Sequence, residues 1–340
     1  MKYLITGGAG FIGSAMIRHI INTSEDQVIN IDSLSYASNL ASLDEISKSS
    51  RYFFENENIC NKSEIYNIFL NYKPDYVVHF AAESHVDNSI NTPDVFMQTN
   101  IMGTYNLLIN ANRYYQNLDK QSKDNFRFLH VSTDEVYGDL SETDDFFEEN
   151  TKYDPSSPYS ASKAASDHLV RAWRRTYGLP TLITNCSNNY GPYQHNEKLI
   201  PTVIRNILCK KKIPIYGNGT NIRDWLYVQD HVEAILNVLH NSDIGETYNI
   251  GGNNQIRNID LVNKICTILD NKIPNQDPGL SKYSDLIEYV EDRAGHDIKY
   301  AINADKIKKT LDWHPKESFE TGIDKTIDWY INNKSSMGLK

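Results

Sequence analysis

The first fourteen residues constrain the fold more than any other stretch of the chain. An apolar run, Tyr3 to Ile5, leads into a cluster of glycines and then into an amphipathic segment. Gly8, Gly10 and Gly13 match G-x-G-x-x-G, and Gly7 begins an overlapping G-x-x-G-x-x-G. Glycines allow the backbone to turn tightly and to approach a pyrophosphate, which the amides at the start of the next helix can bind. We therefore expect a strand, a glycine turn and a helix that together bind a dinucleotide.

Beyond the glycine turn, short apolar runs alternate with longer segments of helical periodicity. This alternation is typical of a parallel sheet covered by helices on both faces. The predicted strands are Lys2 to Thr6, Gln27 to Asp32, Tyr52 to Asn56, Tyr76 to Ala81, Arg127 to Ser132 and Thr181 to Cys186. The predicted helices are Ser14 to Asn22, Lys62 to Tyr72, Asp94 to Tyr115 and Ala161 to Tyr177. Such a series predicts an α/β fold with a Rossmann-type doubly wound parallel sheet.

The pattern loosens from about residue 187, where prolines and glycines interrupt it. We expect a smaller C-terminal substrate-binding lobe that lies over the carboxyl edge of the sheet. The predicted division is a NAD-binding domain at 1–186, with a return segment at about 224–252, and a nucleotide-sugar lobe made of 187–223 and 253–340. No repeat or flexible linker separates them, so we expect one packed unit.

The charge balance restricts the partners. The 340 residues carry a formal net charge of −10, which argues against a nucleic-acid partner. Local cations must then bind any anionic ligand, and Arg223 and Arg293 are candidates. No run approaches the roughly 18 apolar residues of a membrane span, so we expect no membrane partner and a cytoplasmic location.

The cysteines and histidines do not indicate a metal site or a disulfide. Cys60, Cys186, Cys209 and Cys266 show no C-x-x-C pairing and lie in apolar or strand-like segments, so we expect reduced packing thiols. The ten histidines show no metal-ligand spacing, and no metal is predicted.

A carboxylate ends the second predicted strand, about 20 residues after the glycines. At that position Asp32 can accept a hydrogen bond from an adenosine ribose hydroxyl and would repel a 2′-phosphate. Its presence favours NAD over NADP. The structural alternative is that Asp32 only opens a turn with Ser33.

A tyrosine and a lysine lie four residues apart in the segment 159–163. Residues 156–158, Ser-Ser-Pro, predict a helix N-terminus, so Tyr159 and Lys163 share one face of the following helix. An ammonium group nearby favours the phenolate and lowers the pKa of a tyrosine from its usual value of about 10. The pair can then act as a general base. Because Y-x-x-x-K is a common pattern, a surface pair is the alternative, but the dinucleotide fingerprint in the same chain makes Tyr159 and Lys163 a candidate catalytic pair.

Polar residues follow another apolar strand directly, at Ser132-Thr133-Asp134-Glu135. Ligands of doubly wound sheets bind outside the carboxyl ends of the strands, so these side chains should face the cleft. Thr133 can share a substrate hydroxyl with Tyr159, and the pKa values of neighbouring carboxylates tend to be pushed apart, which gives one acid and one base. A solvated turn is the alternative.

Several segments together resemble the extended short-chain dehydrogenase/reductase family. They are GGAGFIGS at 7–14, AAESHVD at 81–87, STDEVYG at 132–138, YSASKAASDHLV at 159–170, NNYGPYQ at 188–194, EKLIP at 197–201, RDWLYVQDH at 223–231 and DRAGHD at 292–297. The resemblance covers nearly the whole chain. Within the family it is to the branch that dehydrates dTDP-glucose, since related sugar epimerases normally lack an Asp-Glu pair after the Ser/Thr.

The resemblance implies a chemistry for five residues. Tyr159 takes the proton of the sugar 4-hydroxyl while carbon 4 gives a hydride to NAD, Thr133 holds that oxygen, and Lys163 holds the cofactor ribose. Glu135 then removes the proton at carbon 5, and Asp134 protonates the departing 6-hydroxyl. The hydride returns to carbon 6, so the product is a 4-keto-6-deoxy sugar that supplies a deoxysugar pathway such as that of dTDP-L-rhamnose.

The resemblance also implies binding residues and a homodimer formed through two helices of each subunit. The expected cofactor-binding residues are Gly7, Gly10, Phe11, Ile12, Gly13, Asp32, Asn58, Ile59, Ala81, Thr99, Tyr159 and Lys163. The expected substrate-binding residues are Ser84, His85, Asn188, Glu197, Lys198, Arg223, Asn258, Arg293 and His296. Arg223 corresponds to a family arginine that meets the diphosphate, which suits the bidentate geometry of a guanidinium.

Some positions depart from the family pattern. Asn58 stands where many relatives carry Asp near the adenine, Asn88 replaces a common Arg, and residues 194–196 are Gln-His-Asn instead of His-Phe-Pro. An amide at position 58 can still donate and accept hydrogen bonds, so we expect NAD to be retained.

Three alternatives stay open at this point: a 4,6-dehydratase for another nucleotide sugar, a nucleotide-sugar 4-epimerase, and a non-catalytic NAD-binding module. The presence of Thr133, Asp134, Glu135, Tyr159 and Lys163 together argues against the module.

Overall fold

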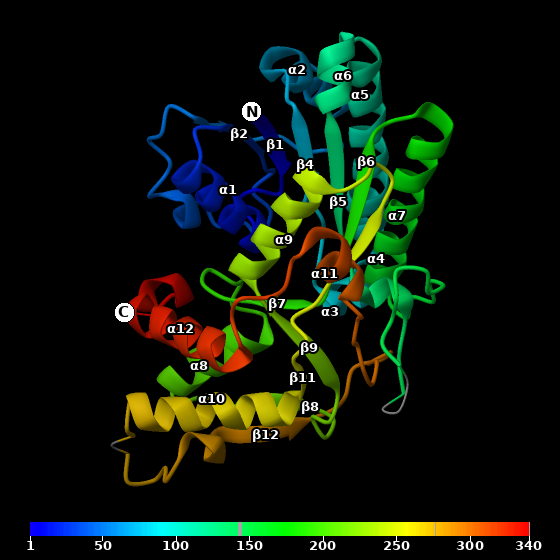
Figure 1. Cartoon of the computed structure of the whole chain (residues 1–340). Coiled ribbons are helices and arrows are strands. Elements are labelled where there is room, and N and C mark those ends of the chain that lie inside the picture. Colours follow the sequence, from blue (N-terminus) through cyan, green and yellow to red (C-terminus); the bar gives the residue numbers. More distant parts are fainter. Residues whose placement is uncertain (142–144, 276, 340) are drawn as a thin grey trace.

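The computed structural model describes residues 1–141, 145–275 and 277–339. A seven-stranded, all-parallel sheet occupies the upper part of Figure 1, with strand order β10-β6-β5-β4-β1-β2-β3. Its strands are β1 (Lys2–Thr6), β2 (Gln27–Ile31), β3 (Tyr52–Glu55), β4 (Tyr76–His79), β5 (Arg127–Thr133), β6 (Thr181–Cys186) and β10 (Thr247–Ile250). The prediction of a Rossmann-type doubly wound sheet is confirmed. All six predicted strands are present. The seventh strand, β10, was not predicted.

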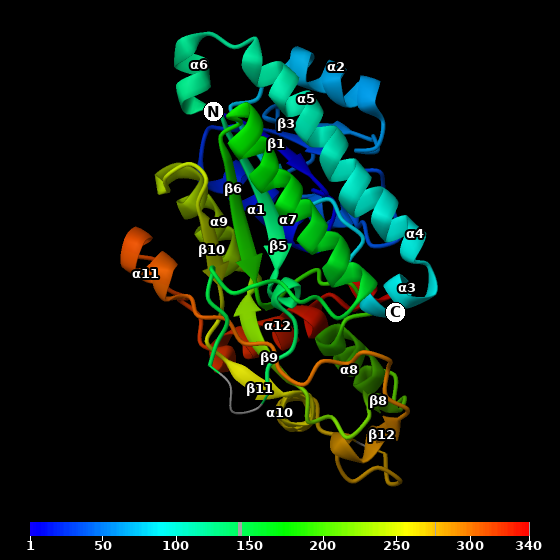
Figure 2. The same cartoon turned by 90° about the vertical axis from the view of Figure 1, so that its right-hand side faces the viewer.

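Helices cover both faces of this sheet, as Figures 1 and 2 show. One face carries α1 (Phe11–Thr23), α9 (Val228–Asn241) and α11 (Asp305–Leu311). The other carries α2 (Lys62–Tyr72), α5 (Thr104–Gln116) and α7 (Pro158–Tyr177), with α6 (Lys120–Asn125) beside them at the top.

The two cores follow from the alternation of side chains along each strand. In β1, Ile5 packs in the core formed with α1 and α9, whereas its neighbour Leu4 packs in the core formed with α2, α5 and α7. Leu4 and Ile5 are both fully buried, as expected for a strand that is covered on both sides.

One predicted helix differs in its geometry. The apolar pattern predicts a single helix from Asp94 to Tyr115, but the structure has α4 (Pro93–Phe96), a π-helical stretch (Met97–Gly103) and then α5. π-helical turns often occur at functional sites. Here the stretch carries Asn100, whose side chain accepts from the Glu83 N–H at 2.8 Å and donates to the Ser162 hydroxyl at 2.8 Å. It thereby fixes the segment after β4 against α7.

The lower lobe is built from small sheets and helices, and the C-terminus lies there (Figure 1). Its strands are β7 (Asn188–Tyr190), β8 (Ile213–Tyr216), β9 (Ile222–Tyr227), β11 (Gln255–Arg257) and β12 (Ile287–Val290), and its helices are α8 (Leu199–Leu208), α10 (Asn258–Lys272) and α12 (Phe319–Asn332). Helix α3 (Val86–Asn91) lies near the junction with the main sheet. The strands form a β11-β9-β7 sheet and a β12-β8 pair. Strand β9 therefore belongs to the lower lobe. The chain returns to the main sheet at α9, which packs on one face of it.

The structure also describes the cysteines, the possible metal clusters and the possible membrane-spanning helices. All four cysteines are free thiols. Within residues 1–141, 145–275 and 277–339, no group of three or more His, Cys, Asp or Glu side chains is arranged to hold a metal ion. Across the same residues, none of the helices has the length and apolar character needed to cross a membrane.

Candidate active site

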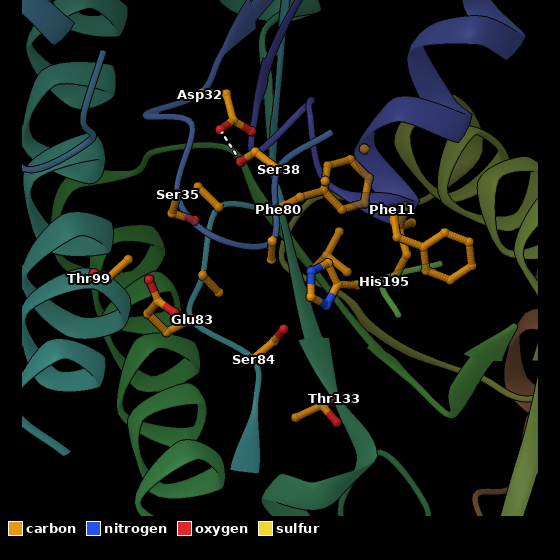
Figure 3. A pocket seen from close by; sticks show the side chains of 18 of the residues that line it. Phe11, Asp32, Ser35, Ser38, Phe80, Glu83, Ser84, Thr99, Thr133 and His195 are labelled. Carbon is orange, nitrogen blue, oxygen red and sulfur yellow. Dashed lines mark hydrogen bonds between the residues drawn. The ribbon is translucent and has the colours of Figure 1, made fainter. Parts of the chain in front are cut away.

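A cavity of about 470 Å³ opens at the carboxyl edge of the main sheet, where the lower lobe meets it. Figure 3 looks into it, with Asp32 near one end and Thr133 near the other. The predicted residues that line it are Gly7, Gly10, Phe11, Ile12, Gly13, Asp32, Asn58, Ile59, Ala81, Ser84, Thr99, Thr133, Glu135, Tyr159, Lys163, Asn188, Glu197 and Lys198. Those that lie outside its lining are His85, Asp134, Arg223, Asn258, Arg293 and His296. The cavity thus joins residues that are far apart in the sequence.

The glycine turn forms a cradle that side chains would fill. Gly7 has a φ of +72°, and a Cβ on it would lie 2.7 Å from the backbone nitrogen of Ala81. A Cβ on Gly13 would lie 2.4 Å from the carbonyl oxygen of Gly7. Helix α1 starts directly after the turn and has no acidic residue in its first turn, so its N-terminal amides can bind an anion. The cradle therefore fits the pyrophosphate of NAD.

Substitution of Gly13 by alanine is expected to weaken NAD binding by about 5- to 150-fold. Crowding of this kind costs about 1–3 kcal/mol, because the added methyl meets backbone atoms that cannot move away, and 1.4 kcal/mol is a factor of ten in affinity. Titration of NAD by fluorescence quenching checks the result. Gly279→Ala is the matched control, since a Cβ there meets only the Asp277 side chain at 3.4 Å. Unchanged NAD affinity in Gly13→Ala would contradict the cradle.

Asp32 follows β2 and is largely buried, with 6% of its surface exposed. Its carboxylate accepts hydrogen bonds from the Ala9 N–H at 2.9 Å, the Leu34 N–H at 2.8 Å and the Ser38 hydroxyl at 2.7 Å. The last bond is drawn in Figure 3. Asp32 therefore both organises the loop after β2 and lines the cavity, so the structural and ligand-binding alternatives coexist at this residue. Its contact with a ribose stays a prediction.

The start of α7 forms as the sequence predicts. Ser157 is the N-cap, with a capping box to Ser160, and Pro158 occupies the first turn. Tyr159 and Lys163 are both buried and both line the cavity.

The Lys163 ammonium makes its hydrogen bonds to strand β5 and none to Tyr159, so its effect on the pKa of Tyr159 stays a prediction. The Lys163 Nζ donates to the Val131 carbonyl at 2.8 Å and lies 3.4 Å from the His130 Nε2. Burial and the negative charge of Glu135 raise the pKa of Tyr159 well above its usual value, and only a hydrogen bond with Thr133 acts in the opposite direction. The phenolate therefore requires a further positive charge in the site.

A buried polar network holds Lys163. The Asp167 carboxylate lies 3.3 Å from the His130 Nε2 and accepts from the Ser132 hydroxyl at 2.9 Å and the Tyr153 hydroxyl at 2.8 Å. Burial lowers the pKa of Lys163 to about 8, and the charge of Asp167 limits that fall. Burial also lowers the pKa of His130 to about 4, so this imidazole is neutral at pH 7. Asp167 is then the anion that keeps the Lys163 ammonium charged.

An Asp167→Asn variant is expected to lose NAD affinity at a lower pH than the unsubstituted protein. Without the carboxylate, the pKa of Lys163 falls below about 8, so the ammonium loses its proton earlier as the pH rises. The dissociation constant of NAD measured from pH 6 to 9 checks the shift, with the exposed Asp124→Asn as the control and circular dichroism as the test of folding. Identical pH profiles for the two variants would contradict this role of Asp167.

The carboxyl groups after β5 differ in their surroundings. Burial, together with the charges of Glu135 and Asp224, raises the pKa of Asp134 well above its usual value. Burial also raises the pKa of Glu135, but Arg223, Arg293 and Lys198 oppose that rise. Asp134 is therefore the better proton donor and Glu135 the better base. The sequence predicts a separation of the two pKa values, and these surroundings give its direction.

The substrate-side residues gather around Glu135 from the lower lobe. Arg223, 5% exposed, donates to the Asp297 carbonyl at 3.0 Å and lies over the Tyr300 ring at 4.4 Å. Arg293 lies 3.5 Å from Asp87. Both arginines lower the pKa of His296, after the larger effect of its burial, so all three side chains are near one another.

The other predicted substrate residues lie at the junction of the two lobes. Lys198 donates from Nζ to the Ser84 carbonyl at 3.1 Å, and His85 lies 3.8 Å from Glu197. Asn258 donates from its backbone to the Asn221 carbonyl at 3.0 Å, at the start of α10. Its side-chain oxygen is buried without a hydrogen-bond partner in the described part of the chain. These contacts join the loop before α8 to the segment after β4.

Sequence reasoning missed several residues that line the cavity. They are chiefly the residues after β2, β4 and β6: Ser35, Ala37, Ser38, Phe80, Glu83, Cys186, Ser187, Asn189, Gln194 and His195. The rule that selected Thr133 and Glu135, namely that ligands meet the carboxyl ends of strands, applies equally to these segments. Cys186, predicted only as a packing thiol, lies in the site as the register partner of Thr133.

Known proteins resemble this chain over nearly its whole length. A family model described as GDP-mannose 4,6-dehydratase matches residues 4–326. A dTDP-glucose 4,6-dehydratase of Escherichia coli is 58% identical over 342 residues, which covers 98% of this chain and 94% of the relative. The chain belongs to the dTDP-glucose 4,6-dehydratase family. It is also a member of the extended short-chain dehydrogenase/reductase family.

Two solved structures of dTDP-glucose 4,6-dehydratases are similar to the whole chain. The enzyme from Bacillus anthracis, in complex with NAD, is 42% identical with a TM-score of 0.86 and 98% coverage of both chains. The enzyme from Streptomyces venezuelae, with NAD and dTDP bound, is 39% identical with a TM-score of 0.88 and the same coverage.

The departures from the dTDP-glucose 4,6-dehydratase pattern have structural roles here. The Asn58 side-chain oxygen accepts from the Cys60 N–H at 2.8 Å, so its amide nitrogen is the group left to meet an adenine. Asn88 lowers the pKa of the Tyr36 hydroxyl, against the larger effect of burial, and that hydroxyl donates to Glu197 at 3.4 Å.

Proposed function

We propose that this chain converts dTDP-glucose into dTDP-4-keto-6-deoxyglucose and water, with NAD as a cofactor that is regenerated in each turnover. The observation that carries the proposal is the position of Asp134 and Glu135. They directly follow Thr133 at the end of β5, and Thr133, Glu135 and Tyr159 line one cavity. A chain that only bound NAD would need no buried Asp134 next to a Glu135 that lines the cavity.

The residues that would hold NAD are the glycine cradle and the N-terminus of α1 for the pyrophosphate, Asp32 for the adenosine ribose, and Lys163 for the second ribose. Bound NAD supplies the site with a hydride acceptor and a positive charge. Because burial raises the pKa of Tyr159, that positive charge would favour the phenolate.

The first proton transfer belongs to Tyr159. Its phenolate removes the proton of the sugar 4-hydroxyl, and the Thr133 hydroxyl holds the same oxygen in place. Oxidation at carbon 4 produces a ketone that acidifies the neighbouring carbon 5.

The elimination of water belongs to the two carboxyl groups. Glu135 removes the proton from carbon 5, and Asp134 protonates the 6-hydroxyl as it leaves. The Asp134 Oδ2 is buried and has no hydrogen-bond partner within the described residues, so it is the oxygen that can meet the 6-hydroxyl. Glu135 then returns a proton to carbon 5 when a hydride reaches carbon 6. The diphosphate is assigned to Arg223, with Lys198, Arg293 and His296 nearby.

The nucleotide preference is tested by incubating the protein separately with dTDP-glucose, UDP-glucose and CDP-glucose. The expected result is the alkali-induced absorbance of a 4-keto sugar with dTDP-glucose. A stronger signal with UDP-glucose or CDP-glucose would overturn the thymidine assignment. No signal with any of the three would overturn the dehydratase proposal.

We also propose that the chain is a homodimer formed through α5 and α7, which lie side by side in Figure 2. Apolar side chains are exposed on these helices and on the π-helical stretch before α5, with Met102 47%, Tyr105 37% and Tyr177 49% exposed. Sedimentation should give a particle of twice 39.0 kDa, and a 39.0 kDa particle would contradict the dimer. A cytoplasmic location and the supply of dTDP-L-rhamnose or another deoxysugar stay predictions.

A further inference from the structure

The proposed function leaves a proton imbalance between two side chains. In each turnover Tyr159 gains the proton of the 4-hydroxyl, whereas Asp134 gives one proton to the departing water. Glu135 takes a proton from carbon 5 and returns one, so it is restored. Before the next turnover, Tyr159 must therefore lose a proton and Asp134 must gain one.

Thr133 lies between these two side chains. Its Oγ1 is 3.4 Å from the Asp134 Oδ1, and its hydroxyl is near enough to Tyr159, on the wall of the same cavity, to lower the pKa of that tyrosine. The Glu135 N–H donates to the same Oγ1 at 3.3 Å and fixes the hydroxyl in this position. A hydroxyl has one donor and two acceptor sites, so Thr133 can accept from Glu135 and Tyr159 while it donates to Asp134.

We propose that the Thr133 hydroxyl relays a proton from Tyr159 to Asp134 after each turnover, and this proposal rests on the function proposed above. The O–H bond of Tyr159 breaks as a bond forms between that proton and the Thr133 Oγ1. The original O–H bond of Thr133 breaks as its proton binds the Asp134 Oδ1. No atom is oxidised or reduced, and one negative charge moves from the Asp134 carboxylate to the Tyr159 phenolate.

The burial of Asp134 favours this route over exchange with bulk water. Asp134 is 1% exposed and lies outside the lining of the cavity, whereas Thr133 and Tyr159 line it. Its Oδ1 faces Thr133, and its Oδ2 is the oxygen left for the substrate. The relay thus restores acid and base together, inside a closed site.

The experiment compares Thr133→Val, which keeps the shape but removes the hydroxyl, with Thr133→Ser, which keeps the hydroxyl. Product from dTDP-glucose is measured by rapid quench, with NAD in excess, for both variants and the unsubstituted enzyme. Thr133→Val should form product in a burst of up to one equivalent per site, followed by turnover at least tenfold slower than the burst. Imidazole buffer of increasing concentration should accelerate only the slow phase, because it carries the proton instead. Thr133→Ser should show no slow, buffer-dependent phase.

Other results overturn the relay. If the first and later turnovers of Thr133→Val are equally slow, or its slow phase does not respond to buffer, Thr133 only binds the substrate oxygen. If the Thr133→Val protein no longer binds NAD, the same measurements are made on Thr133→Ala and are judged by the same criteria. If the proposed function itself is wrong, the unsubstituted protein forms no 4-keto sugar. That result differs from failure of the relay, in which the unsubstituted protein still forms the product.

Discussion

A Tyr159→Phe variant is expected to lose turnover of dTDP-glucose by about 10²–10⁴-fold, the usual contribution of a positioned general base. The substitution removes one oxygen atom from a buried ring at the start of α7 and leaves its packing against Phe96 in place. Without the phenolate, no side chain of this site takes the proton of the 4-hydroxyl, so oxidation at carbon 4 stops before water is lost. The rate of 4-keto sugar formation measures the effect.

Tyr289→Phe is the matched control, because Tyr289 lies on β12 outside the lining of the cavity and is 58% exposed. It should keep normal turnover. NAD affinity should stay within a few-fold in Tyr159→Phe, which separates a lost base from a damaged cofactor site. A Tyr159→Phe variant that keeps more than a tenth of the normal rate would assign the base to another residue.

An Asp134→Asn variant is expected to separate oxidation from dehydration. The amide cannot donate a proton to the 6-hydroxyl, so loss of water should slow by about 10²–10⁴-fold. Tyr159 and Thr133 are intact, so the proton at the 4-hydroxyl is still removed. Mixing the variant with NAD and dTDP-glucose should therefore produce the absorbance of reduced nicotinamide, without the 4-keto-6-deoxy product.

The exposed Asp124→Asn variant is the control for a single lost carboxylate and should behave as the unsubstituted protein does. Normal dehydration by Asp134→Asn would contradict the assignment of the acid. A 4-epimerase would instead keep its turnover in Asp134→Asn and form a product that retains its 6-hydroxyl. Equal loss of both steps would show that Asp134 supports the site instead of acting in one step.

The sheet could be predicted from the sequence because its signals are local. The ends of β1, α2 and β6 agree with the predicted bounds, since each is a compact apolar or amphipathic segment next to a residue that interrupts it, namely Gly7 after β1, Asn61 before α2 and Pro180 before β6. Strand β10 is only four residues long, and it joins the sheet beside β6, which precedes it by sixty residues. Its place depends on tertiary pairing and not on a local pattern. The division into two domains stays a prediction.

Part of the site could be predicted for the same reason. Thr133 and Glu135 directly follow a strand, and Tyr159 and Lys163 are one helical turn apart, so short-range rules bring them to the cleft. The ionisation of Tyr159 could not be predicted, because it depends on the direction of the Lys163 ammonium. That direction is set by His130 and the Val131 carbonyl, which lie on β5, whereas Lys163 lies on α7.

On the substrate side, the charge balance indicated only Arg223 and Arg293 as candidate cations, and the other residues came from the resemblance. Arg223, Arg293 and Lys198 act on the pKa of Glu135 from three separate segments of the lower lobe. No spacing in the sequence indicates that these three cations surround one carboxyl group.

The most direct test of the account is the fate of the hydrogen at carbon 4. The protein is incubated with dTDP-glucose that carries deuterium at that carbon, and the product is analysed by mass spectrometry and proton NMR. The account predicts a 4-keto-6-deoxy sugar in which the deuterium is in the carbon 6 methyl group, because the hydride leaves and returns within one site. Deuterium that is lost to solvent, or a product that retains its 6-hydroxyl and has deuterium back at carbon 4, would contradict it.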